Sequence, residues 1–242
     1  MKLTLAFLYA TTMNIYGDRG NVLALQRRCQ WRGIELAVVP VGLGDPIEPG
    51  RFDLFFFGGG QDKEQVAVAA DLQGPKGQAL KAEIDAGAPA LAVCGGYQLL
   101  GHYYQPAGAP RLPGIGVFDV ISEAGSERFI GNVIVDSDEF GTLVGFENHS
   151  GRTRLGAGVR PLGRVRVGRG NNGQDGTEGA RYRNAIGCYL HGSFLPKNPA
   201  VADYLIAAAI ERRYGPRPLP PLDDRLEAAA HASALDRAAR TR

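Results

Sequence analysis

The stretch Ala88-Pro-Ala-Leu-Ala-Val-Cys-Gly-Gly-Tyr-Gln98 decides the fold. Its first half is an apolar run that follows Gly87, which is typical of a short strand buried on both faces. Gly95 and Gly96 allow a sharp turn into the next helix, and such a turn requires small residues two positions from its centre. Strand, sharp turn and helix together form the pattern of a nucleophile elbow, here with Cys94 in place of serine.

The helix after this turn would direct backbone N–H groups and its positive end at the sulfur of Cys94. That environment favours the thiolate, which is the nucleophilic form. The alternative is a packing role, because free cysteine is among the most buried residue types. The rest of the chain has to decide between the two.

Strands and helices alternate along the first hundred residues. Strands are expected at 3–9, 34–39, 53–57 and 89–93, and helices at 20–32, 63–70, 76–86 and 96–104. This alternation predicts an α/β fold with a mostly parallel central sheet and helices on both faces. Extra β pieces are expected in the second half at 115–121, 128–135, 142–146 and 163–168, followed by a buried strand at 185–190 and a helix at 199–214.

We expect one α/β domain over residues 1–214 and a separate tail over 215–242. The tail begins with four prolines, which favour an extended linker, and its residues 222–240 are an alanine-rich helical stretch. A net charge of +2 gives no electrostatic reason to expect nucleic acid or a membrane surface as a partner.

The three cysteines are odd in number and widely spaced, which suits a reducing compartment better than a disulfide framework. No Cys-x-x-Cys pair or histidine cluster predicts a metal site. The apolar N-terminus is too short for a transmembrane helix and lacks a good signal-peptidase site. These features predict a cytoplasmic protein with no transmembrane segment and no metal.

Two other strand ends carry residues suited to chemistry with Cys94. Three glycines at 58–60 follow the strand 53–57, so the N–H groups of Gly59 or Gly60, together with that of Gly95, suit an oxyanion hole. A tight turn with Asp62 as helix cap is the alternative. His191 ends the strand 185–190 and is placed to act as general base on a thiol. A buried structural histidine is the alternative there.

Five stretches together resemble the class I (triad-type) glutamine amidotransferases, in the cobyric acid synthase-like branch, where His is followed by Gly rather than by Pro-Glu. The similarity covers about residues 3–214 and is greatest to glutaminase subunits of lipid II isoglutaminyl synthases. The stretches are Asn14-Ile-Tyr-Gly-Asp-Arg-Gly-Asn21, Gly58-Gly-Gly-Gln-Asp62, Cys94-Gly-Gly-Tyr-Gln98, Phe146-Glu-Asn-His-Ser-Gly-Arg-Thr153 and Leu190-His-Gly-Ser-Phe194.

The resemblance implies hydrolysis of glutamine through a glutamyl thioester on Cys94. His191 would move the proton to departing ammonia, and the glycines 59, 60 and 95 would hold the oxyanion. Arg128 matches a substrate-binding arginine of the family, and its guanidinium suits the α-carboxylate of glutamine. From the residues alone, Arg128 would be read as a solvated charge at a strand edge.

Three further residues would help to seat glutamine by this resemblance. Gln98 lies on the first turn after the elbow. Asn148 and His149 resemble a loop whose backbone holds substrate, although the two residues by themselves are typical of a turn.

The sequence departs from the commoner class I pattern at Ser193, where most members carry a glutamate that orients the histidine. The third acid is therefore open, with Glu147, Asp203 or none as the possibilities. Asp18 and Asn21 are expected to cap the helix 20–32.

The resemblance implies a MurT-like, Mur-ligase-type partner in a heterodimer. ATP and Mg²⁺ would be bound on that partner only, with no cofactor on this chain, which has no G-x-x-x-x-G-K-[ST] motif. The acceptor would be the D-glutamate of lipid II, amidated to D-isoglutamine. Three alternatives stay open: ammonia supply to a cobyrinic-acid-type ligase, a partner-independent Cys–His hydrolase, and a non-catalytic binding subunit.

Overall fold

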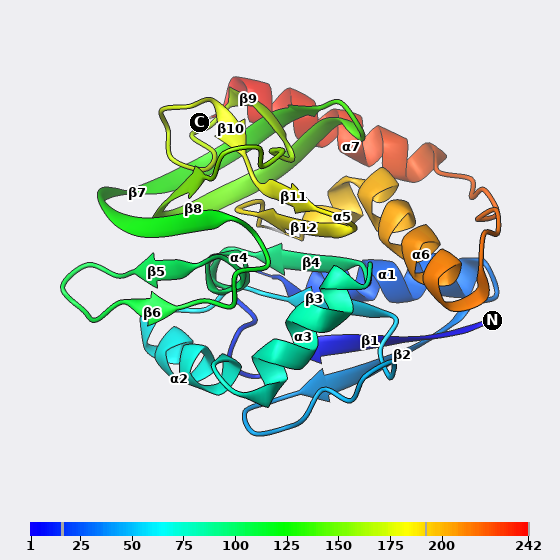
Figure 1. Cartoon of the computed structure of the whole chain (residues 1–242). Helices are drawn as coiled ribbons and strands as arrows, with labels where there is room; N and C mark the ends of the chain where they lie inside the picture. The colour runs from blue at the N-terminus through cyan, green and yellow to red at the C-terminus, as the bar shows by residue number, and fades with distance from the viewer. Residues whose placement is uncertain (16, 192, 242) are drawn as a thin grey trace.

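A computed structural model describes residues 1–15, 17–191 and 193–241. Its first sheet has the strand order β11-β12-β4-β3-β1-β2, and only the β11–β12 pair is antiparallel. The strands are β1 (Lys2–Leu8), β2 (Glu35–Val41), β3 (Leu54–Phe57), β4 (Ala90–Val93), β11 (Ala180–Tyr182) and β12 (Ala185–Cys188). The sheet confirms the predicted parallel core (Figure 1).

Helices cover both faces of this sheet because the strand order reverses next to β1. The connection β1–α1–β2 runs toward one edge and β3–α2–α3–β4 toward the other. Right-handed crossovers in opposite directions place their helices on opposite faces. The helices are α1 (Arg19–Trp31), α2 (Asp62–Leu72), α3 (Pro75–Asp85), α4 (Gly95–Leu100), α5 (Phe194–Lys197) and α6 (Pro199–Tyr214).

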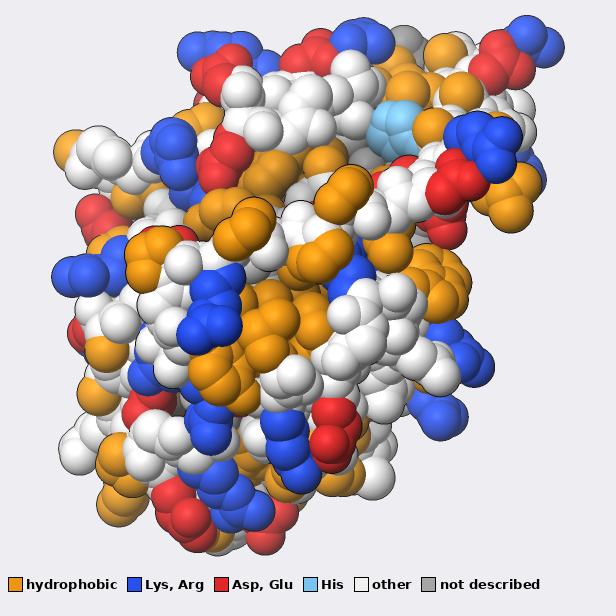
Figure 2. Space-filling model, turned by 90° about the vertical axis from the view of Figure 1, so that its right-hand side faces the viewer, with side chains coloured by type: hydrophobic (Ala, Val, Ile, Leu, Met, Phe, Trp, Pro, Cys, Tyr) orange, Lys and Arg blue, Asp and Glu red, His pale blue; other side chains and the backbone are white. Residues whose placement is uncertain are grey.

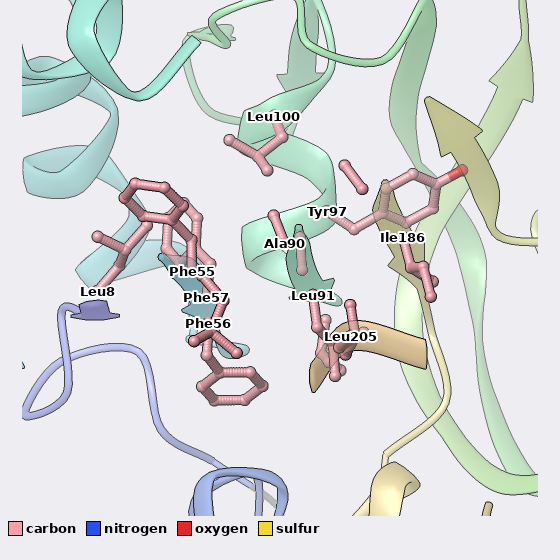
Figure 3. Close-up of a cluster of buried hydrophobic side chains, with 14 of the residues drawn as sticks. Leu8, Phe55, Phe56, Phe57, Ala90, Leu91, Tyr97, Leu100, Ile186 and Leu205 are labelled. Atoms are coloured by element: carbon pink, nitrogen blue, oxygen red, sulfur yellow. The ribbon is translucent and has the colours of Figure 1, made fainter. Parts of the chain in front are cut away.

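The central strands are fully buried, as their apolar sequences predict. All four residues of β3 and of β4 are buried, and the rings of Phe55, Phe56 and Phe57 fill the space on both sides of β3 (Figure 3). Helix α6 contributes Leu205 to the same core. Strand β4 is therefore held rigidly up to the residue that follows it, Cys94.

A second sheet is built mainly from one long antiparallel hairpin. Strand β7 (Val120–Ser137) pairs with β8 (Gly141–Leu155), and a register shift falls between Ala124 and Phe129. The remaining strands of this sheet are β5 (Tyr103–Gln105), β6 (Leu112–Pro113), β9 (Gly163–Val167) and β10 (Thr177–Glu178).

Most sequence-based boundaries lie close to the observed ones, including the helix 199–214, which is α6. The expected helix 96–104 ends at Leu100, and β5 follows where that helix was expected to continue. The expected pieces 128–135 and 142–146 are parts of β7 and β8, and most of 115–121 precedes β7. Asn148 and His149 lie in β8 and not in a turn.

The C-terminal tail docks on the second sheet through helix α7 (Arg225–Arg240), close to the expected 222–240. Ala238 is buried against Ile134 and Val144. Asp224, just before α7, forms an ion pair with Arg28 of α1 at 2.8 Å. Figure 2 views the side where α6 and the linker to α7 lie, and apolar side chains gather there among Lys and Arg.

Candidate active site

The elbow at Cys94 has the strained backbone that its sequence predicts. Cys94 has φ 51° and ψ −106°, a conformation that costs energy for any residue with a side chain, and it lies between β4 and α4. The backbone is held from both sides, because Cys94 N–H donates to Cys188 O at 2.8 Å and Gln98 N–H donates to Cys94 O at 2.9 Å. At Gly96 a methyl group would lie 2.6 Å from Phe57 O, so only glycine fits.

Three distant segments meet at Gly59. A methyl group added there would lie 2.9 Å from Cε1 of His191 and 3.3 Å from Cβ of Cys94. The glycine loop after β3, the elbow after β4 and the histidine after β12 therefore share one volume at the carboxyl edge of the parallel strands. This is where open α/β sheets carry their sites.

His191 is oriented by Asp18, an acid that the sequence analysis assigned to a helix cap. Its Nδ1 lies 3.2 Å from Oδ1 of Asp18, and both side chains are fully buried. Oδ2 of Asp18 accepts the Gly59 N–H at 2.7 Å. Asp18 sits at the N-cap position of α1 but makes no side-chain cap, so the expected capping role was wrong. Asn21 also does something else, since its Oδ1 accepts the N–H of Leu195.

The two acids considered from the sequence serve other purposes. Glu147 accepts the backbone N–H groups of Arg169 and Gly170 at 2.9 and 3.0 Å. Asp203 pairs with Arg28 and Arg32 at 2.6 and 2.7 Å, and so joins α6 to α1.

Burial by itself would lower the pKa of His191, because a charged imidazolium is poorly solvated there. The charge of Cys94, the hydrogen bonds with Asp18 and Cys94 and the charge of Asp18 outweigh burial and raise this pKa to about 10. At neutral pH the imidazolium is therefore favoured opposite the sulfur. This arrangement suits a thiolate–imidazolium pair.

The N–H group of Gly59 is not available to an oxyanion because it donates to Asp18. The expectation that Gly59 is an oxyanion donor was therefore wrong, and this glycine instead provides the space in which Cys94 and His191 meet. The remaining candidate donors are the amides of Gly60 and Gly95. They are neighbours, since a methyl group on Gly95 would lie 3.1 Å from Gly60 N.

A cavity of about 410 Å³ opens at Cys94. It is lined by Ile15, Gly60, Gln61, Asp62, Lys63, Gln65, Cys94, Gln98, Tyr104, Arg128, His149 and Ser150. The cavity brings together Cys94, Gln98, Arg128 and His149. Asn148 does not line it, but its Oδ1 accepts Arg128 Nε at 2.6 Å and so positions the guanidinium.

A buried chain of hydrogen bonds runs behind the cavity wall. Gln98 Nε2 donates to the hydroxyl of Tyr189 at 3.1 Å, and that hydroxyl also pairs with Thr153 at 2.7 Å. His149 stacks on the Tyr189 ring with centroids 3.6 Å apart, and its Nδ1 bonds to Gly151 O at 2.8 Å. Burial lowers the pKa of His149 to about 3, so this imidazole is neutral at pH 7.

No group of three or more His, Cys, Asp or Glu side chains suited to a metal occurs in residues 1–15, 17–191 and 193–241. Within the same described ranges, every helix is too short or too polar to cross a bilayer.

The sequence reasoning missed Asp18 and Tyr189. A signal for Asp18 existed, because it follows β1, and the carboxyl end of β1 lies beside that of β3 in the sheet. Tyr189 follows a buried strand of small residues and carried no such signal.

Comparison with known proteins agrees with this geometry. The model of the CobB/CobQ-like glutamine amidotransferase domain matches residues 4–199. The chain is 41% identical over 239 residues to the GatD subunit of the glutamine-hydrolysing lipid II isoglutaminyl synthase from Staphylococcus aureus, covering 99% of this chain and 97% of that protein. It is 40% identical to the subunit of the same name from Streptococcus pneumoniae, covering 88% and 83%.

Among solved structures, a glutamine amidotransferase from Thermotoga maritima matches with a TM-score of 0.53 at 15% identity, covering 97% of each chain. That likeness shows the fold. The family model and the near full-length relatives go further, and the chain belongs to the CobB/CobQ-like glutamine amidotransferases.

Proposed function

We propose that this protein is the glutamine-hydrolysing subunit of a lipid II isoglutaminyl synthase and supplies ammonia to a ligase partner. The observation that carries the proposal is the meeting of Cys94, His191 and Gly59 beside a cavity large enough for an amino acid. The near full-length similarity to two GatD subunits supports the choice of reaction.

The thiolate of Cys94 attacks the side-chain carboxamide carbon of glutamine. The N–H groups of Gly60 and Gly95 stabilise the resulting oxyanion. His191 gives its proton to the nitrogen, the C–N bond breaks, and ammonia leaves a glutamyl thioester. Water then attacks the thioester with His191 as base, which releases glutamate and restores the thiolate. Asp18 holds the imidazole in the tautomer and orientation that both steps require.

Arg128 binds the α-carboxylate of glutamine through its guanidinium. Asn148 mainly positions that arginine, because its Oδ1 accepts a hydrogen bond from Nε of Arg128. Gln98 and His149 form the wall behind the substrate, where their positions are held by Tyr189.

The partner in this proposal is a MurT-like Mur-ligase subunit in a heterodimer. Amide formation from a carboxylate requires activation, so the partner binds ATP and Mg²⁺. It amidates the D-glutamate of lipid II to D-isoglutamine. We place the complex in the cytoplasm, in keeping with three unpaired cysteines. A cobyrinic-acid-type ligase is the alternative partner.

The test measures glutamate and ammonia released from glutamine, with and without a co-expressed MurT-like subunit. We expect Cys94→Ala to abolish release and Cys29→Ala, which removes a buried free cysteine outside the cavity, to retain it. Amidation of lipid II by the complex identifies the acceptor. Ammonia release by Cys94→Ala would refute the mechanism, and full glutaminase activity without amidation would favour another partner or a partner-independent hydrolase.

A further inference from the structure

The charges that line the cavity are unequal in number. Arg128 and Lys63 are its two cationic residues, and Asp62 is the single carboxylate among the described lining residues. His149 adds no charge at pH 7 because its pKa is lowered to about 3. Free glutamine has an α-carboxylate and an α-ammonium group, so a site that binds it needs an acceptor for the ammonium as well as a cation for the carboxylate.

Asp62 is held at the edge of this cavity by neighbouring structure. It is the first residue of α2, where the helix dipole favours a negative charge. Its Oδ1 accepts the hydroxyl of Tyr104 at 3.3 Å, and Tyr104 is buried in β5 with 1% of its surface exposed. Its second oxygen, Oδ2, makes no hydrogen bond or ion pair within the described ranges of the chain.

The two opposite charges reach the cavity from different parts of the fold. Asp62 comes from the loop-to-helix junction after β3, next to the glycines at 58–60. Arg128 comes from β7 of the second sheet, where Asn148 of β8 holds it. A ligand held by both would have its α-carbon between them and its side chain free to extend toward Cys94.

We propose that Asp62 binds the α-ammonium group of glutamine and makes the site specific for the free amino acid. This inference rests on the glutaminase function proposed above and adds a residue to it. An N-acylated glutamine, or a glutamine within a peptide chain, lacks the positive charge and would leave the Asp62 carboxylate opposite a neutral amide.

The experiment compares glutamine with glutaramate, which has the same carboxamide and carboxylate but no amino group. The complex with the ligase subunit is assayed as wild type, as Asp62→Asn and as Glu64→Gln. The asparagine keeps an oxygen for Tyr104 and loses only the charge. Glu64→Gln is the matched control, because it removes one negative charge from the same helix turn but Glu64 does not line the cavity.

We expect Asp62→Asn to lower kcat/KM for glutamine at least tenfold, mainly through KM, and to change kcat/KM for glutaramate less than twofold. Glu64→Gln should change neither. Equal losses on both substrates, or no loss on glutamine, would overturn the role of Asp62 while leaving the glutaminase function intact. A wild-type complex that does not hydrolyse glutamine would overturn the proposed function itself, and this inference with it.

Discussion

Asp18 illustrates how a residue type that favours helix caps is used for chemistry. It occupies the N-cap position of α1, yet both of its oxygens are taken, one by His191 and one by the Gly59 amide. One carboxylate thereby fixes the orientation of the imidazole and the position of the glycine loop. Since all three groups are buried, few other partners compete for it.

We expect Asp18→Asn to lower kcat by about 10²–10⁴-fold, because an asparagine amide favours the wrong imidazole tautomer. The pH profile of kcat should also shift, because Asp18 helps to raise the pKa of His191. A variant that only disturbed the structure would leave this profile unchanged. Glutamine turnover over a pH series measures both.

Asp203→Asn is the matched control, because it removes one of the two acids considered from the sequence and weakens only the ion pairs with Arg28 and Arg32. Similar kcat losses in the two variants would contradict the role assigned to Asp18.

Tyr189 is a second positioning residue, because its ring stacks on His149 and its hydroxyl accepts a hydrogen bond from Gln98 Nε2. Tyr189→Phe keeps the ring stack and leaves the amide of Gln98 without its acceptor. We expect KM for glutamine to rise several-fold, with a smaller change in kcat.

Tyr97→Phe provides the comparison, because Tyr97 is equally buried and its hydroxyl bonds to Asn171 away from the cavity. Steady-state kinetics of both variants test the assignment, and an equal rise in KM for the two would contradict it.

At the scale of elements, the β7–β8 hairpin builds one wall of the cavity, a role that its sequence alone did not reveal. Its two strands bring Arg128 and His149 over a cavity whose other wall comes from the first sheet. The pieces predicted at 128–135 and 142–146 were the apolar parts of these strands. Polar residues next to these pieces, such as Asp136, Asn148 and His149, are also strand residues because their backbone pairs with the other strand.

Helix α4 was predicted too long for a related reason. Gly101 is a poor helix former and is extended in the structure, and the N–H of His102 bonds to Val120 O. Local propensity and tertiary hydrogen bonds to the second sheet therefore both end the helix at Leu100.

The tail is attached by α7, and its docking can be tested by a substitution. Ala238→Glu places a carboxylate against Ile134 and Val144 and should lower the free energy of unfolding by about 1–3 kcal/mol. Ala229→Glu, on an exposed position of the same helix, should have little effect. Thermal unfolding of both variants tests this docking, and equal melting temperatures would mean that α7 does not dock on the second sheet.

At the scale of the whole molecule, buried acids make stability depend on pH. Glu178 is fully buried, and burial raises its pKa to about 8. The folded state therefore binds more protons than the unfolded state between the ordinary glutamate pKa and about 8. This contribution to stability is fully present below the ordinary value and is lost as pH rises through about 8.

His149 acts with the opposite sign, because its pKa is lowered in the folded state and its contribution is lost as pH falls below about 6.5. Denaturant titrations of wild type and Glu178→Gln at several pH values separate the contribution of Glu178 to stability from that of His149. We expect the difference in unfolding free energy between them to change between about pH 4.5 and 8. A constant difference would show that Glu178 does not titrate in that range.

The sequence by itself determined the parallel core and the reactive residues at the carboxyl ends of its strands. Buried strands read as continuous apolar runs, and the turn at Cys94 depends on small neighbours, so these features are local and visible. Cys94, His191 and the glycine loop were predicted to meet, and in the structure they do. Only the tertiary structure decided which acid supports His191, which glycine amides remain available, and which polar residues face the cavity. Those choices depend on contacts between segments that are distant in the sequence, such as Asp18 with Gly59 and with His191, and no local pattern records such a contact.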